Sequence, residues 1–181
     1  MLKIVTKTCL FILISTFFCF AQKSKQGKER WDVKTMTDSL FYKVDSNSIP
    51  VMVRDINNIP RPKNIYNKTG RLQEEMQCFT IECKIIDFIL EDDGDYHLMV
   101  TDVNGSETMI VELVKPSYIN KQYYLQAKKA RDTFNYYKRK KLLLSKTFVI
   151  TGVIFFDLPH NQKGAAANYL ELHPVLKFYI K

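Results

Sequence analysis

The fold is decided by residues 76–113, which read MQCFTIECKIIDFILEDDGDYHLMVTDVNGSETMIVEL. Apolar and polar side chains alternate along most of this stretch, as they do in a β-strand with one buried face. The alternation changes phase once, at residues 85–86, which indicates a β-bulge. Turn sequences at residues 91–95 and 104–105 divide the stretch, so we predict three antiparallel strands joined by two hairpins.

Beyond this meander the apolar pattern becomes helical. Between residues 118 and 141 the apolar side chains recur three or four positions apart and form one stripe. The pattern then predicts a buried strand over residues 147–157, a loop over 158–168 and a final strand over 169–180. Pro174 in the final strand suits an edge position or a bulge. The order β-β-β-α-β-β predicts a mainly β (α+β) fold, a five-stranded OB-like barrel, and a different α+β sheet with the same order is the structural alternative.

The 181-residue length and the composition, 46% apolar and 25% charged, are typical of one globular domain. They exclude a chain that is disordered throughout, which would contain few apolar residues. We divide the chain into a signal peptide at residues 1–21, a leader and extended arm at 22–75, and the barrel domain at 76–181. Cys78 and Cys83 lie ~16 Å apart along one predicted strand, too far for a disulfide.

Residues 1–21 have the three parts of a secretory signal peptide: a basic start, an apolar run, and small residues before a cleavage point near Ala21. The apolar run is shorter than the ~20 residues that a spanning helix needs, so we expect no transmembrane segment in the mature chain. The alternative is a lipoprotein anchored at Cys19, which requires a small residue where Phe18 stands. We therefore expect a secreted or periplasmic protein with a cleaved signal peptide.

Four segments of the mature chain carry a shared pattern: ERWDVKT at residues 29–35, EDDGDYHL at 91–98, TMIVE at 108–112, and FFDxxHxQxGxAxNxxELHPV at 155–175. Together they resemble an uncharacterised family of exported bacterial proteins, and the resemblance covers nearly all of the mature chain. It implies that the N-terminal arm belongs to the domain, and it carries no activity. Relatives tend to have a cysteine near residues 115–120, which this chain lacks.

The turn Asp93-Gly94-Asp95 carries a second resemblance, to the staphylococcal-nuclease group, which also uses an OB-type barrel. It is similar to that group's Asp-Gly-Asp-Thr turn, where a carboxylate helps to bind calcium. Tyr96 stands in place of the threonine, and Glu112 lies in the region where the group has an arginine that steadies phosphate. The resemblance therefore implies an OB-type barrel with a cation-binding turn, and it does not extend to the phosphate-steadying arginine.

The candidate site follows from the fold, because OB barrels bind ligands across their second and third strands, between the first hairpin loop and the loop that joins the last two strands. Here the first loop has four acids at residues 91–95, and clustered carboxylates attract hard cations such as calcium. The candidate ligands of a divalent cation are Asp92, Asp93, Asp95 and Glu171. The candidate catalytic residues are His97, Asp157, His160 and His173. The opposite loop adds Gln162 and Asn168 as candidate ligand-binding residues.

Two interpretations of these residues follow. In the functional one, the two loops meet and their polar residues form a metal-assisted hydrolase, such as a phosphodiesterase. In the structural one, the acidic loop is an ordinary tight turn with solvated charges, and Glu171 and His173 satisfy each other on an outer face. Local metal-binding spacings such as HxH and HExxH are absent, so the metal hypothesis depends on the fold to bring the loops together.

Positive charge is concentrated in and after the predicted helix. Residues 118–146 contain nine basic side chains against Asp132 alone, and the whole chain has a formal net charge of +8. Segregated charge favours an anionic partner, such as a nucleic acid, a lipid headgroup or a wall polymer. The candidate contacts are Lys128, Lys129, Arg131, Lys138, Arg139, Lys140 and Lys141. The main functional hypothesis is an exported OB-like binding module for an anionic partner, and the alternative is a helix whose outer face is simply solvated.

Overall fold

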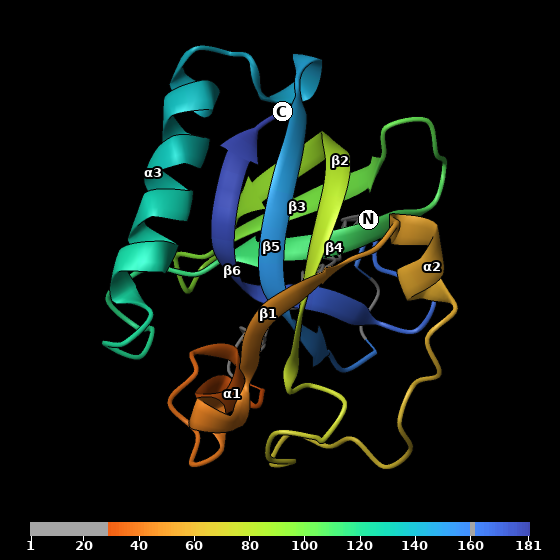
Figure 1. Ribbon diagram of the computed structural model, residues 1–181, viewed down its shortest axis with the longest axis vertical. Coiled ribbons are helices and arrows are strands. Elements are labelled where there is room, and N and C mark those ends of the chain that lie inside the picture. The colour runs from red at the N-terminus through yellow and green to blue at the C-terminus, as the bar shows by residue number, and fades with distance from the viewer. Residues whose placement is uncertain (1–28, 160–161) are drawn as a thin grey trace, which may run out of the picture.

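The computed structural model describes residues 29–159 and 162–181 (Figure 1). The predicted signal peptide, the leader as far as residue 28, and His160 lie outside these described residues. In chain order the elements are α1 (Trp31–Lys34), the 3-10 helix η1 (Phe41–Lys43), β1 (Asp45–Pro50), α2 (Val53–Asn57), β2 (Gln77–Leu90), β3 (Tyr96–Asp102), β4 (Thr108–Leu113), α3 (Tyr124–Arg139), the 3-10 helix η2 (Leu143–Ser145), β5 (Thr147–Phe156) and β6 (Leu170–Ile180).

Five strands close into a barrel. The strand order is β2-β3-β4-β6-β5, and β5 pairs with β2 to complete the ring. Neighbouring barrel strands are antiparallel except β4 and β6, which run parallel. The connection from β4 to β5 passes through α3, which packs along β6 (Figure 1). The mainly β, five-stranded OB-like barrel that the sequence predicts is therefore confirmed.

Alternate residues of each strand fill the interior of the barrel. Leu98, Val111 and Leu172 belong to this core and are fully buried. Phe134 of α3 packs into the same core, where its ring contacts those of Tyr96 and Phe178. The sequence neighbours of the inward residues point to the outer side of the barrel, so the alternation decides which side chains can form a site there.

Two irregularities shape the barrel strands. The register between β2 and β3 shifts between Ile85 and Asp87, which confirms the expected bulge. The register between β6 and β5 shifts beside Gly152, so that Pro174 lies at a bulge. The edge position considered for Pro174 is wrong, because β6 pairs with β4 on one side and β5 on the other. Gly152 permits the close packing there, because a Cβ at this position would come within 2.8 Å of Cβ of Leu172.

The helix is shorter than the predicted span of residues 118–141. Residues 115–123 form turns instead, and the amide of Asn120 donates to the carbonyl of Thr35 in the N-terminal arm. Because these backbone groups bond outside the helix, α3 begins only at Tyr124.

The arm from residue 29 to residue 75 packs against the barrel through buried contacts. Its strand β1 adds to β2 in parallel. The guanidinium of Arg30 lies 2.5 Å from the carboxylate of Glu75 and also donates to the carbonyl of Phe156 at the end of β5. Both charged side chains are fully buried, so neither can lose its partner without a large cost. The arm is thereby fixed over the region where β5 ends.

Candidate functional site

A row of ionisable side chains crosses the outer side of three neighbouring barrel strands. His97 in β3 lies directly opposite Glu112 in β4. The parallel pairing of β4 with β6 sets Val111 beside Leu172, so the next residues, Glu112 and His173, are also neighbours. Because these residues alternate with core positions, all three point away from the barrel interior. The fold thus gathers side chains that are far apart in the sequence.

Glu112 is the centre of this row. Its Oε1 lies 3.2 Å from Nδ1 of His97, and its Oε2 lies 2.9 Å from Nδ1 of His173. Glu91 approaches the first imidazole, with its Oε1 3.4 Å from Nδ1 of His97. Asp95 lies near the imidazole of His173. One potential ligand atom from each of Asp95, Glu112 and His173 lies within 4.8 Å of the other two. One carboxylate is therefore shared by two groups of potential metal ligands.

The arm covers this part of the barrel. Only 1% of His173 and 2% of Glu112 is exposed. Lys34 of α1 reaches the same region, where its Nζ lies 3.5 Å from Oδ1 of Asp157. Glu171 is as buried as His173, and its Oε2 lies 4.0 Å from Nδ1 of that residue, too far for a hydrogen bond. Glu171 and His173 therefore form at most a distant ion pair, and the expectation of a solvated pair on an outer face is wrong because both side chains are buried.

Burial dominates the ionisation of two acids in the cluster. The pKa of Asp95 is raised to about 6, chiefly because burial disfavours the carboxylate. The pKa of Glu171 is raised well above its ordinary value, first by burial and then by the negative charges of Asp157 and Glu112. The environment of Glu171 therefore favours its neutral form more than water does.

Glu112 and His97 respond to their neighbours more than to burial. Burial disfavours the charge of Glu112, but the two histidines outweigh it, with His173 contributing more than His97, and they hold the pKa of Glu112 well below its ordinary value. Burial would also lower the pKa of His97, but contacts with Glu112 and Glu91 raise it to about 10. Glu112 therefore remains ionised, and each of its oxygen atoms attracts positive charge.

Several polar atoms of the cluster form no hydrogen bond within the described part of the chain. They include both ring nitrogens of His173, Nδ1 of His97 and Oε2 of Glu171. The short contacts with Glu112 are ion-pair distances at which hydrogen-bond geometry is not met. Buried polar atoms are normally bonded. A metal ion in either group of potential ligands would be bound by one ring nitrogen and by carboxylate oxygens, which are common metal ligands, whereas Glu171 belongs to neither group.

A small cavity reaches one side of the cluster. Its volume is about 290 Å³, and it is lined by Asp87, Phe88, Ile89, Glu91, His97, Met99, Gln162 and Lys163. Glu91 comes from the first hairpin loop and Gln162 from the loop between β5 and β6, so the two loops meet at this cavity. Asp95 and His173 do not line it.

The other acids of the first hairpin loop stay outside the cluster. Asp92 is exposed. The carboxylate of Asp93 accepts the backbone amide of Asp95 and thereby shapes the turn. Only Asp95 points inward, where its carboxylate accepts the amide of Lys115 and approaches Glu112.

The candidate residues of the loop between β5 and β6 have different roles. Asn168 serves the fold, because its side-chain amide donates to the carbonyls of Ile56 and Ile59 in the arm. Gln162 is the one of the two candidate ligand-binding residues that reaches the cavity. His160 lies outside the described residues.

The basic residues of α3 and of the two positions after it divide into three sets. Arg131 donates to the carbonyl of Gly94, and the cationic groups of Arg131 and Lys138 each lie 4.5 Å from the ring centroid of Tyr96. These two side chains therefore fasten the helix to the barrel. Lys128 forms an exposed ion pair along the helix. The basic side chains that extend into solvent are Lys129, Arg139, Lys140 and Lys141.

Three members of the cluster were not assigned from the sequence: Glu112, Glu91 and Lys34. Glu112 interrupts the apolar third strand at an outward position, and this interruption was the available signal. Glu91 is one of four acids in the first hairpin loop, and nothing in the sequence distinguishes it from the other three. Lys34 gives no sequence signal, because only the packing of the arm brings it to the barrel.

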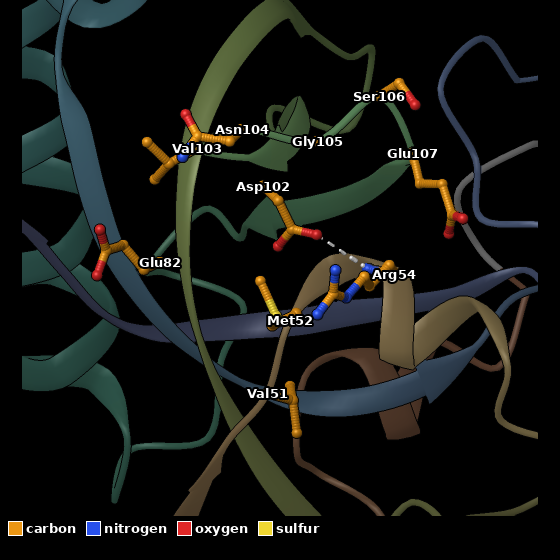
Figure 2. A pocket seen from close by; sticks show the side chains of 10 residues that line it. All are labelled: Val51, Met52, Arg54, Glu82, Asp102, Val103, Asn104, Gly105, Ser106 and Glu107. Carbon is orange, nitrogen blue, oxygen red and sulfur yellow. Dashed lines mark hydrogen bonds between the residues drawn. The ribbon is translucent and has the colours of Figure 1, made fainter.

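A larger cavity lies between α2 and the turn that follows β3 (Figure 2), with a volume of about 560 Å³. Asp102 is its most buried acid. The carboxylate of Asp102 accepts the amide of Arg54 (Figure 2). It also accepts the amide of Val53, and so it caps the start of α2. None of the predicted site residues lines this cavity.

Among residues 29–159 and 162–181, no helix combines the length and the apolar character needed to cross a membrane.

Comparisons with known proteins do not supply a family. No family model matches the chain, and no curated protein matches it. Among solved structures, an OBody bound to hen egg-white lysozyme is similar, with 12% sequence identity and a TM-score of 0.37 over 57% of this chain and 80% of that chain. A likeness at this level carries no argument about function, so the functional conclusion depends on the site itself.

Proposed function

We propose that the barrel is a binding module that holds a divalent cation at its ligand face, with Asp95, Glu112 and His173 as ligands. One observation carries the proposal: Nδ1 of His173 lies 2.9 Å from Oε2 of Glu112, and Asp95 offers an oxygen within 4.8 Å of both ligand positions. All three residues are buried. The bound cation would provide the positive charge that attracts an anionic group of the ligand.

The distances and atom types support a coordination site. Two ligand atoms with bonds of ~2.1 Å lie ~3.4 Å apart around a tetrahedral ion and ~3 Å apart at right angles around an octahedral one. The 2.9 Å contact between Glu112 and His173 is close to the octahedral spacing. An imidazole beside two carboxylates suits Zn²⁺ or Mn²⁺ better than Ca²⁺, which prefers oxygen ligands alone. We therefore propose a transition-metal dication.

Thermal unfolding in the presence of Zn²⁺, Mn²⁺ or Ca²⁺ tests the proposal. A cation that binds only the native state should stabilise it by about 2.7 kcal/mol at 100 times its Kd. Glu112→Gln keeps the side-chain shape and removes the charge between the two histidines, so it should abolish the rise in melting temperature. Asp92→Asn is the matched control, because it removes an exposed carboxylate from the neighbouring loop.

Circular dichroism without added metal establishes whether Glu112→Gln folds, and His173→Asn replaces it if it does not. The proposal is rejected if no cation raises the melting temperature of the wild-type chain at millimolar concentration. It is also rejected if the Glu112 variant responds to metal as fully as Asp92→Asn does.

A metal-assisted hydrolase of the phosphodiesterase type is the catalytic form of this proposal. A bound cation lowers the pKa of a coordinated water and polarises a phosphoryl oxygen. The cavity beside His97 and Gln162 favours this form, because it gives a substrate group a route toward the cluster. Hydrolysis of bis(4-nitrophenyl) phosphate should then require both the metal and Glu112. Metal binding without hydrolysis would reject the catalytic form and support the non-catalytic binding module.

The exposed basic side chains of α3 support a second candidate function, binding to an anionic partner. Lys129, Arg139 and Lys140 extend into solvent, and they are free to contact phosphate or carboxylate groups because Arg131 and Lys138 already fasten the helix. Such binding weakens with salt because it depends on the release of counterions.

Retention on single-stranded DNA, anionic lipid vesicles and cell-wall fractions at low and high salt tests this second candidate. The triple variant Lys129→Gln, Arg139→Gln, Lys140→Gln should lose retention. The matched control is Lys43→Gln, Lys63→Gln, Lys68→Gln, which removes the same charge from exposed positions of the arm. No retention of the wild-type chain at low salt, or equal loss in both triple variants, contradicts a specific basic surface on α3.

A further inference from the structure

Two groups of potential metal ligands meet at Glu112. We call Asp95, Glu112 and His173 the closed group, and Glu91, His97 and Glu112 the open group. Glu91 and His97 line the cavity of about 290 Å³, whereas Asp95 and His173 do not. The two groups therefore share one carboxylate and differ in their access to solvent.

The carboxylate of Glu112 is oriented as a bridge between the groups. Its Oε1 faces Nδ1 of His97 at 3.2 Å, and its Oε2 faces Nδ1 of His173 at 2.9 Å. Metal ions in a shared site lie ~3.5–4 Å apart, a separation that one carboxylate can span. Each oxygen of Glu112 thus lies next to a different histidine, as is needed if the carboxylate bridges two cations.

The imidazoles provide an independent indication of a ligand at each position. Nδ1 of His97 and Nδ1 of His173 form no hydrogen bond among the described residues. Their side chains are only 6% and 1% exposed. A set of acids alone would not indicate a ligand, but in each group a buried imidazole nitrogen lies close to an oxygen of Glu112 without hydrogen-bond geometry, as two ligands of one ion would.

Acidic side chains outnumber basic ones in the cluster. The acids that interact within it are Glu91, Asp95, Glu112, Asp157 and Glu171. Lys34 is the basic side chain in contact with them through Asp157. The excess of acids over bases favours the binding of cations, and an imidazole that binds a cation gives up its proton.

We infer that the cluster binds two divalent cations bridged by Glu112, one in the closed group and one in the open group. This inference rests on the proposed metal-binding function and extends it. The cation of the closed group is buried beneath the arm and links the first hairpin loop, through Asp95, to β4 and β6. The cation of the open group faces the cavity and can accept an anionic oxygen ligand there, as open metal sites do.

Native mass spectrometry of the full chain loaded with Zn²⁺ measures the number of bound ions. We expect about two ions per chain, the number that a bridged site holds. His97→Asn should retain the ion of the closed group alone, and His173→Asn that of the open group alone. Glu112→Gln should lose both, and Asp92→Asn should keep both as the matched control.

The outcomes separate this inference from the proposed function. If the wild-type chain binds a single ion and His97→Asn still binds it, the two-cation inference is wrong and the proposed single-cation function stands. No bound ion rejects both. Two ions that neither histidine variant removes are adventitious ions elsewhere and overturn the inference. Electron paramagnetic resonance of the Mn²⁺-loaded wild-type chain needs no variant: bridged ions give a spin-coupled spectrum, and an uncoupled spectrum contradicts the bridge.

Discussion

The helix α3 and the row formed by His97, Glu112 and His173 are both rich in ionisable side chains, but they use them differently. On α3 the unpaired cations extend into water, where screening makes each charge worth little. In the row the charges are buried beneath the arm, where a carboxylate without a positively charged partner destabilises the native state. Burial of charged side chains, rather than the density of charge along the sequence, therefore identifies the stronger candidate site.

The largest expected effect comes from removing the buried cation beside the row. Lys34→Met should destabilise the native state by about 3–5 kcal/mol, because it leaves buried carboxylates without their partner. Lys34 has a side chain only 6% exposed. Lys43→Met is the matched control in the same arm, and as an exposed substitution it should change stability by at most ~0.5 kcal/mol.

Urea unfolding of the Lys34 and Lys43 variants measures this difference. Added Zn²⁺ should recover part of the stability lost by Lys34→Met, since the cation brings positive charge to the same acids. Equal stability of the two variants would mean that the row does not need positive charge, and the contrast with α3 would fail.

A smaller effect is expected within α3 itself. Arg131→Ala should cost about 1.5–3 kcal/mol, the range for hydrogen bonds to a charged group, because its guanidinium donates to the carbonyls of Gly94 and Leu113. Lys129→Ala should remain within ~0.5 kcal/mol of the wild-type chain. Denaturant unfolding compares the two. If Lys129 proves as costly as Arg131, the division of the helix into fastening and solvated cations is wrong.

The smallest expected effect is the coupling between the two regions. The triple variant at Lys129, Arg139 and Lys140 should leave the Zn²⁺-induced rise in melting temperature unchanged, because distant sites without shared partners act additively. Glu112→Gln should likewise leave salt-dependent retention on anionic matrices unchanged. Loss of metal binding in the triple variant would show that α3 and the row form one site.

The order of elements could be predicted because it depends on local patterns. Alternation over residues 76–113 gave the three strands, and the phase change at 85–86 gave the bulge. Cys78 and Cys83 are free, as their spacing along one strand predicted. The start of α3 could not be predicted, because the amide of Asn120 bonds to the arm, a contact that no local pattern records.

The site was only partly predictable. The OB topology predicts that Asp95, His97 and His173 lie near one another, and the structure brings all three beside Glu112. The topology could not separate Asp95 from Asp92, since one turn residue points inward and the other into solvent. It also could not assign Glu112 its central place, which depends on the pairing of β4 with both neighbours.

The central claim is that Glu112 and His173 bind a metal ion rather than each other. Anomalous diffraction at the zinc absorption edge, from crystals grown with Zn²⁺, tests it most directly. We expect an anomalous peak ~2.0–2.2 Å from both Oε2 of Glu112 and Nδ1 of His173. A direct hydrogen bond between these two atoms, with no anomalous peak beside them, would contradict it.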